Sequence, residues 1–201
     1  MTKQTFTTLP HYLRPGLRLV FIGYNPAIFS ADAGHYYARP GNVFWRQLSQ
    51  AGLAGRAVTS DDDRLLMDEA GIGFVDLCWR PTVRASELTR AEIAEGARRL
   101  HGELLEFQPA LAVFSGRGIY QHFGRHALGL GAAALASRPY GPQPERIGRT
   151  VPWVIPSSSG LASKWHGERL VLLHELAAEL QPRALARNSK PFADSPESER
   201  S

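Results

Sequence analysis

The sequence contains one cysteine, Cys78, and this scarcity excludes several classes of protein. A single cysteine cannot build a disulfide framework within the chain, nor a four-cysteine zinc or iron–sulfur site. Its neighbours Leu77 and Trp79 are apolar. Because apolar burial raises the pKa of a thiol, we expect Cys78 to be a structural residue rather than a nucleophile.

Long apolar runs and metal-binding patterns are missing as well. No stretch approaches the roughly 18 apolar residues of a membrane span, and the N-terminus lacks the apolar centre of a signal peptide. Of the seven histidines, only His122 and His126 are four residues apart, with the helix-weakening Gly124 between them. We expect both to be surface residues. The absences predict a cytosolic protein with no membrane partner and no metal.

What is present suits one globular domain. With 201 residues, 43% of them hydrophobic, the chain can bury a full core. We expect a lead-in over residues 1–16, a single domain over residues 17–182, and a polar, proline-containing tail over residues 183–201 that is disordered. No internal repeat is visible.

The positive charge is concentrated in one segment. The formal net charge is +4, and residues 117–149 carry five arginines against one acidic residue, Glu145. A basic segment of this kind suits an anionic polymer such as DNA, although a solvated surface has the same composition.

Four apolar runs predict buried strands, at residues 17–22, 72–77, 110–115 and 151–155. Helical patterns alternate with them, and Ser60 with Asp63 resembles a capping box at one helix start. Residues 127–150 are rich in alanine, glycine and proline and are predicted to be a connection. The alternation predicts a three-layer α/β fold with a central parallel four-stranded sheet flanked by helices.

Polar residues follow these strands. Asn25 lies in a Gly23–Pro26 turn after the first strand, and a loop of about 15 residues follows, too aromatic to be disordered. Asp76 lies near the end of the second strand. The turn 116–118 and the loop 157–163 follow the other two. Carboxyl ends of parallel strands share an edge, so we expect these segments along one rim, where open α/β sheets bind ligands.

The residue types on this rim suit an enzyme that takes a base out of a nucleic-acid stack. Such an enzyme needs a filler for the hole, a flat side chain against the base and a group aimed at the sugar. Leu161, Tyr37 (or Tyr36) and Asn25 are of those types. An amide can position a water, whereas Asp76 is the better base. Simpler roles are a core contact for Leu161, a turn former for Asn25 and a structural carboxylate for Asp76.

Five short motifs, in order and spacing, resemble those of the mismatch-specific uracil/thymine-DNA glycosylases, a family within the uracil-DNA glycosylase superfamily. The resemblance spans about residues 17–180. Its motifs are Gly23-Tyr24-Asn25-Pro26, Asn42-Val43-Phe44-Trp45, Gly71-Ile72-Gly73-Phe74, Arg80-Pro81-Thr82 and Pro156-Ser157-Ser158-Ser159-Gly160-Leu161.

The resemblance implies a monofunctional base-excision repair enzyme. Such an enzyme flips uracil, and in some cases thymine or a damaged pyrimidine, out of G·U or G·T mismatches in double-stranded DNA. It hydrolyses the N-glycosidic bond, and the family needs no metal or cofactor. We expect the chain to act as a monomer.

Roles carry over motif by motif. Asn25 would hold the water that attacks the sugar C1′, Tyr24 would contribute its backbone to the base pocket, and Tyr37 would stack on the base. Leu161 would be the wedge. The remaining DNA contacts would come from Ser157 at the scissile nucleotide and from Ser159, Gly160 and Ala162 at the widowed guanine.

Two departures from the family pattern bear on chemistry and selectivity. Where Asp76 stands, lysine or asparagine is common, and a carboxylate could share or take over the catalytic role of Asn25. The loop reads Ser-Ser-Ser-Gly-Leu where bacterial members have Asn-Pro-Ser-Gly-Leu, which predicts broader selectivity. The alternatives are a broad uracil-DNA glycosylase acting on single and double strands, and a non-catalytic mismatch-binding protein.

Overall fold

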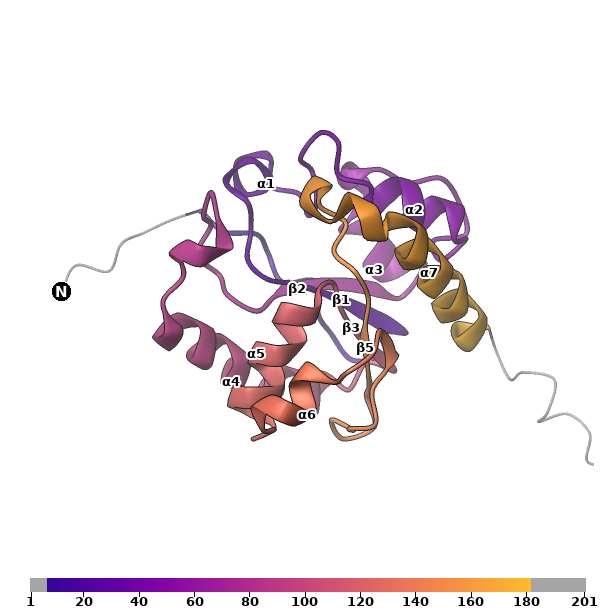
Figure 1. Ribbon diagram of the computed structural model, residues 1–201. Helices are drawn as coiled ribbons and strands as arrows, with labels where there is room; N and C mark the ends of the chain where they lie inside the picture. The colour runs from indigo at the N-terminus through magenta and orange to yellow at the C-terminus, as the bar shows by residue number, and fades with distance from the viewer. Residues whose placement is uncertain (1–6, 182–201) are drawn as a thin grey trace, which may run out of the picture.

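The protein is a three-layer α/β structure in a computed structural model that describes residues 7–181 (Figure 1). Its sheet has the strand order β2-β1-β3-β5-β4. Four strands are parallel, as predicted: β1 (Leu19–Gly23), β2 (Ile72–Asp76), β3 (Leu111–Phe114) and β5 (Val151–Val154). The predicted four-stranded parallel core is therefore confirmed.

A fifth strand corrects the prediction for residues 127–150. This segment is more than a connection, since it forms helix α6 (Ala132–Ala136) and strand β4 (Gly141–Pro142), which pairs antiparallel with β5. Strand β4 has only two residues, too few to show the alternation of apolar and polar side chains by which strands are predicted. Its pairing with β5 depends on backbone hydrogen bonds, which the sequence does not reveal. Proline is tolerated there because β4 lies at the edge of the sheet.

Helices cover both faces of the sheet. The α-helices are α1 (Ile28–Ala33), α2 (Phe44–Gln50), α3 (Leu65–Glu69), α4 (Arg90–Phe107), α5 (Arg117–Ala127), α6 and α7 (His166–Leu180). Three short 3-10 helices are η1 (Ser60–Asp62), η2 (Ala85–Glu87) and η3 (Gly160–Trp165). Within residues 7–181, none of the helices has the length and apolar character needed to cross a membrane.

The sheet has a hydrophobic core on each face, and alternate side chains of β1 contribute to the two cores. Leu19 and Phe21 pack with α2, α3 and α7, whereas Val20 and Ile22 pack with α4 and α5. Successive side chains of a strand point to opposite faces, so a strand buried on both faces is apolar throughout. All residues of β1 are buried accordingly, and those of β2 are buried too.

Two details at the sheet edge and at a helix start differ from the simplest interpretation of the sequence. Part of the expected lead-in belongs to the folded domain, because Tyr12 pairs with Phe74 at the outer edge of β2 through two backbone hydrogen bonds of 3.0 Å. The capping box is one residue earlier than predicted, with Thr59 and Asp62 in place of Ser60 and Asp63. The expected tail lies outside the described residues.

Helix α4 approaches the end of β2 closely at one glycine, which gives a test of the packing. A Cβ on Gly96 would overlap the carbonyl oxygen of Leu77, whereas a Cβ on Gly102 of the same helix would meet nothing. We expect Gly96→Ala to lower the free energy of unfolding by roughly 1–3 kcal/mol through overpacking. Gly102→Ala should raise it by about 0.5–1 kcal/mol through helix propensity. Urea denaturation measures both, and stabilisation by both substitutions would contradict the packing.

Candidate active site

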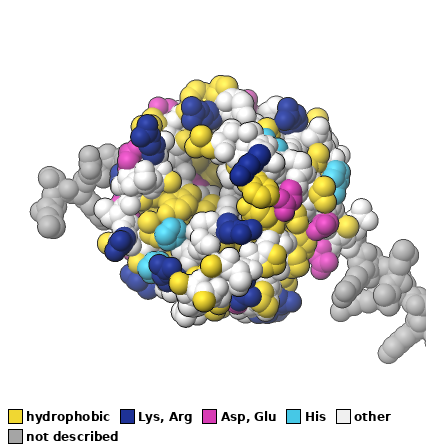
Figure 2. Space-filling view, viewed as in Figure 1, with side chains coloured by type: hydrophobic (Ala, Val, Ile, Leu, Met, Phe, Trp, Pro, Cys, Tyr) yellow, Lys and Arg dark blue, Asp and Glu magenta, His cyan; other side chains and the backbone are white. Residues whose placement is uncertain are grey.

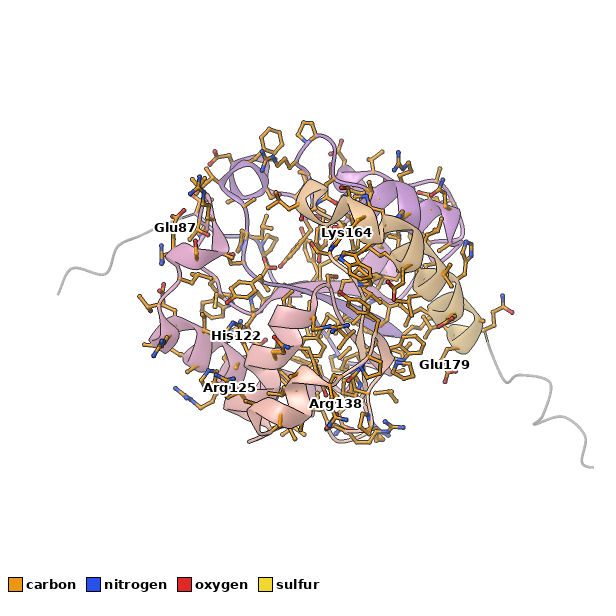
Figure 3. All side chains as sticks on the ribbon, viewed as in Figure 1. Glu87, His122, Arg125, Arg138, Lys164 and Glu179 are labelled. Carbon is orange, nitrogen blue, oxygen red and sulfur yellow. The ribbon has the colours of Figure 1, made fainter. Side chains whose placement is uncertain are left out.

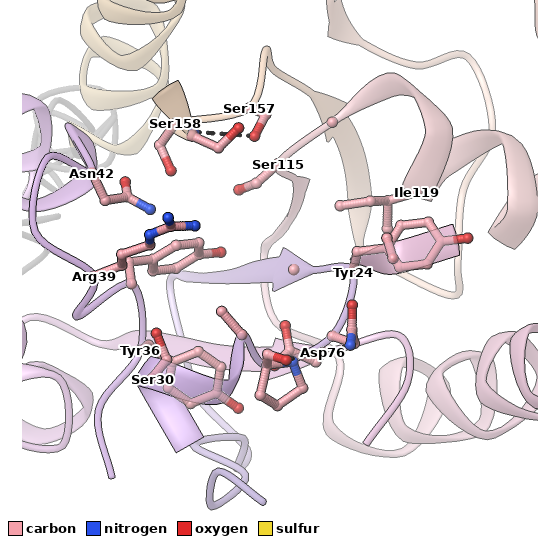
Figure 4. A pocket seen from close by; sticks show the side chains of 18 of the residues that line it. Tyr24, Ser30, Tyr36, Arg39, Asn42, Asp76, Ser115, Ile119, Ser157 and Ser158 are labelled. Atoms are coloured by element: carbon pink, nitrogen blue, oxygen red, sulfur yellow. Dashed lines mark hydrogen bonds between the residues drawn. The ribbon is translucent and has the colours of Figure 1, made fainter. Parts of the chain in front are cut away.

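A cavity of about 410 Å³ opens at the carboxyl end of the parallel strands, and the space-filling view shows the surface hollowed there (Figure 2). Its lining comes from the segments after all four parallel strands, including Asn25, Asp76, Gly116 and Ser157. The predicted common rim is therefore confirmed. The turn that bears the amide and the serine loop meet across one cleft (Figure 4).

Asp76 is the acidic group of this cavity. It is the last residue of β2, lies opposite Gly23 in the sheet register and is buried. A side chain at Gly23 would overlap its Oδ1, so the glycine of the Gly23–Pro26 turn makes room for the carboxylate. Burial raises the pKa of Asp76 from 3.8 to about 7, although the nearby charge of Arg99 lowers it. Asp76 can therefore exchange a proton near neutral pH.

Asn25 is held in one orientation by the turn at residues 80–82. Its Nδ2 donates hydrogen bonds of 2.8 Å to the carbonyl oxygen of Arg80 and to Oγ1 of Thr82. Both amide protons are thus used, and Oδ1 receives no hydrogen bond from the described residues. Because Asn25 lines the cavity, this oxygen can accept a hydrogen bond from a water or a substrate there.

Tyr37 forms part of an aromatic stack beside the cavity. Its ring lies parallel to that of Phe44 at a centroid distance of 3.9 Å, so Phe44 covers one face of the ring, and Tyr37 also lines the cavity. The buried guanidinium of Arg169 lies 5.2 Å from the centre of the Phe44 ring. Burial lowers the pKa of Arg169 to about 10, which still leaves it charged at neutral pH. A buried cation of this kind is stabilised by ring quadrupoles.

The loop that carries Tyr37 is anchored by Asp63. This fully buried carboxylate accepts a hydrogen bond of 2.9 Å from the Tyr36 backbone N–H and lies 3.1 Å from Nδ1 of His35. Tyr36 also donates its hydroxyl proton to the carbonyl oxygen of Pro10. Tyr37 itself has a left-handed backbone, with φ of 53°, which is uncommon for a residue other than glycine. These contacts hold it in that conformation.

Two buried hydroxyl groups in the cavity lack hydrogen-bond partners among the described residues. They are the phenol of Tyr37 and Oγ of Ser115, which directly follows β3. Burial, and then the charge of Asp76, raises the pKa of Tyr37, whereas the neighbouring hydroxyl of Ser115 lowers it, so the phenol stays protonated although it forms no well-aligned hydrogen bond. Unpaired buried polar groups are costly, and a polar ligand would satisfy both. Sequence reasoning missed Ser115, although its place at a strand end is the same signal that identified Asp76.

The serine loop after β5 forms the opposite wall. Ser158 is buried, and its carbonyl oxygen accepts a hydrogen bond from the backbone N–H of Val43. Oγ of Ser157 accepts one from the backbone N–H of Ser159 (Figure 4). Both Ser157 and Ser159 line the cavity. The loop is thereby tied to the segment before α2, across the cleft from Asn25.

Leu161 projects from the start of η3 and is fully exposed. It therefore does not fold back onto the core. Gly160 beside it is exposed, Ala162 is half-buried, and neither these two residues nor Leu161 lines the cavity. The Ala162 N–H donates to the carbonyl oxygen of Ser159, which closes this turn. An apolar side chain is thus presented to solvent on the loop that borders the cavity.

One comparison with known proteins decides the family. A family model described as Uracil DNA glycosylase superfamily matches residues 10–181, most of the chain. The protein belongs to the uracil-DNA glycosylase superfamily. This membership supports hydrolytic DNA glycosylase activity on uracil, a place in DNA repair, and DNA as the partner.

The structure also shows where Tyr24 and Cys78 lie. Tyr24 lines the cavity, and its carbonyl oxygen accepts a hydrogen bond of 2.9 Å from the backbone N–H of Cys78. Cys78 is buried outside the cavity, and burial raises the pKa of its thiol to about 12. Within residues 7–181, no cluster of three or more potential metal ligands is found.

The ionisation of Asp76 should make stability depend on pH. Its pKa is higher in the folded protein than the ordinary value of 3.8. The unfolded chain therefore loses this proton first, and stability falls as pH rises from about 4 to about 7. We expect the free energy of unfolding of Asp76→Asn, relative to that of the wild type, to increase by on the order of 2–4 kcal/mol when the pH is raised from 4.5 to 8.

Urea denaturation at the two pH values measures this difference. Asp61→Asn, which removes an exposed carboxylate, is the matched control for the loss of one charge. If the two substitutions behave alike, Asp76 ionises as an ordinary surface carboxylate does.

Proposed function

We propose that this protein is a monofunctional glycosylase that flips uracil out of G·U mismatches in duplex DNA and hydrolyses its N-glycosidic bond. Thymine opposite guanine and damaged pyrimidines are further substrates of the same site. The observation that carries the proposal is the pairing of two groups in one cavity: the buried carboxylate of Asp76 and the fixed amide of Asn25.

The chemistry needs a water, a base and stabilisation of a cationic sugar. Oδ1 of Asn25 orients the water toward C1′, and the carboxylate of Asp76 accepts the proton that the water loses on attack. The bond between C1′ and the base nitrogen breaks, and its electron pair leaves with the base. Glycoside cleavage passes through an oxocarbenium-like sugar. The negative charge of Asp76 stabilises that cation, which an amide does less well.

The flipped base is held by shape and by polar contacts. It stacks on the face of Tyr37 that Phe44 leaves open, and the unpaired hydroxyl of Ser115 bonds to its edge. Tyr24 contributes its backbone to the pocket. A cavity of about 410 Å³ is in the size range of small-ligand sites, which supports room for a pyrimidine.

The exposed loop supplies the contacts to the duplex. Leu161 enters the space that the base leaves, as apolar wedges do when proteins unstack DNA. Ser159, Gly160 and Ala162 contact the widowed guanine, and Ser157 contacts the phosphate of the scissile nucleotide. The monomer is proposed as the acting form, since the mechanism requires no group from a second copy of the chain.

A broader uracil-DNA glycosylase is the second candidate, and Asp76 itself favours it. A carboxylate accelerates bond cleavage without help from guanine contacts, so single-stranded uracil and U·A pairs become substrates. Excision rates on U·G duplex, U·A duplex and single-stranded DNA separate the two candidates. Abasic sites produced on any of these substrates exclude a non-catalytic mismatch-binding protein.

Substitution of Asp76 should reduce the excision rate more than substitution of Asn25 does. We expect Asp76→Asn to lower single-turnover excision of uracil by roughly 100-fold or more, the usual loss when a general base is removed. Asn25→Ala should lower the rate less, because the carboxylate remains. The reverse order, measured on a U·G duplex, would return the main role to Asn25.

The wedge role of Leu161 predicts a dependence on the substrate strand. Leu161→Ala should slow excision from duplex by roughly tenfold, because unstacking is no longer compensated. Excision from single-stranded DNA should change little, since no hole has to be filled. Parallel single-turnover assays on both substrates measure the effect, and equal losses on the two would remove the wedge role.

A further inference from the structure

A second hollow, of about 370 Å³, lies between helices α4 and α5. Figure 3 labels two of its lining residues, His122 and Arg125, both on α5. The other three are Arg90 and Ile93 of α4 and His126 of α5. Four of the five lining side chains are basic, and none is acidic.

The basic groups of this hollow have no counter-charges within residues 7–181. None of Arg90, Arg125 and His126 forms an ion pair or a side-chain hydrogen bond there. The nearest carboxylate in sequence to Arg90, that of Glu92, is engaged by Arg80 and Thr89. The cluster therefore presents unneutralised positive charge.

Other arginines of the basic segment are engaged elsewhere. Arg138 pairs with Glu145, Arg149 bonds to Oε1 of Gln108, and Arg117 lies over the ring of Tyr140. The basic character predicted for residues 117–149 is thus partly neutralised within the fold. On α5, Arg125 and His126 form neither an ion pair nor a side-chain hydrogen bond, and Arg117 contacts only the ring of Tyr140 and has no counter-charge within residues 7–181.

The hollow adjoins the active site through one aromatic contact. The ring of His122 meets that of Tyr24 edge-on, with centroids 5.7 Å apart, and Tyr24 lines the catalytic cavity. The rings of His122 and His126 lie parallel, 6.4 Å apart. Burial, together with His126 and Arg125, lowers the pKa of His122. An anion bound in the hollow would offset the positive charges of Arg90 and Arg125.

We propose that this hollow binds a backbone phosphate of the DNA strand beside the flipped nucleotide. The proposal rests on the proposed function only in taking DNA as the partner. Arginine forks and imidazole N–H groups are suited to phosphate oxygens. Such contacts fix the register of a protein on DNA and carry no sequence information. With the serine loop on the opposite wall, the strand would be held on both sides of the cavity.

Binding to duplex DNA at several salt concentrations tests the site. The variants are Arg90→Gln and the double substitution Arg125→Gln with His126→Gln, which change exposed or half-buried side chains. Arg149→Gln is the matched control, because Arg149 precedes β5 and so lies at the opposite end of the sheet. Fluorescence anisotropy on an undamaged duplex between about 50 and 200 mM salt gives affinity and its salt dependence.

We expect each hollow variant to weaken binding and to reduce the slope of log K against log salt by about 0.9 for each phosphate that the variant no longer neutralises. The control should keep the wild-type slope. If the hollow variants have the same salt slope and affinity as the control, the proposed phosphate site is wrong.

Uracil release by the wild-type protein is measured separately, so the two proposals fail independently. If the wild type releases no uracil while the hollow variants still lower the slope, the proposed function fails and the phosphate site stands. If the wild type releases uracil and the slopes are unchanged, only the phosphate site is wrong.

Discussion

The structure depends on a carboxylate placed at the buried end of a central strand. Asp76 fits there because its partner in the sheet register, Gly23, has no side chain. Burying this charge costs free energy, which appears as a pKa raised to about 7. Active sites are where such unfavourable placements are retained, since the same burial that destabilises the anion makes it a proton acceptor near neutrality.

The other residues of the site are held in fixed positions around this carboxylate. On one side, the turn at residues 80–82 fixes the amide of Asn25. On the other, Asp63 anchors the loop that presents Tyr37. The serine loop closes the cleft through a backbone bond to the segment before α2. Each contact joins segments far apart in sequence, so the fold as a whole positions the chemistry.

The sequence predicted those features that local patterns encode. Apolar runs identified the four parallel strands, and the rule that ligands bind at the carboxyl edge brought Asn25 and Asp76 together. Strand β4 was missed because its pairing involves the backbone of two residues. Ser60 and Asp63 were wrongly predicted to form a capping box. Thr59 and Asp62 fit the same local pattern and form it, whereas Asp63 accepts a hydrogen bond from the distant Tyr36 N–H, a contact that no local pattern encodes.

Long-range contacts account for features that the sequence analysis did not predict. Arg169 looks like a surface residue on an amphipathic helix, yet it is fully buried beside Phe44, a residue distant in sequence. Nothing in its neighbours signals that position. The role of Gly23 as space for Asp76 likewise follows from the pairing of β1 with β2, which is not visible from the turn motif.

The pH dependence of single-turnover uracil excision by the wild-type protein tests the central role of Asp76 most directly. If its ionised form accepts the proton from water, the rate should rise about tenfold per pH unit below neutrality and level off above the pKa of about 7. A rate that does not change through neutral pH, or one whose midpoint lies near the ordinary aspartate value of 3.8, would contradict that role.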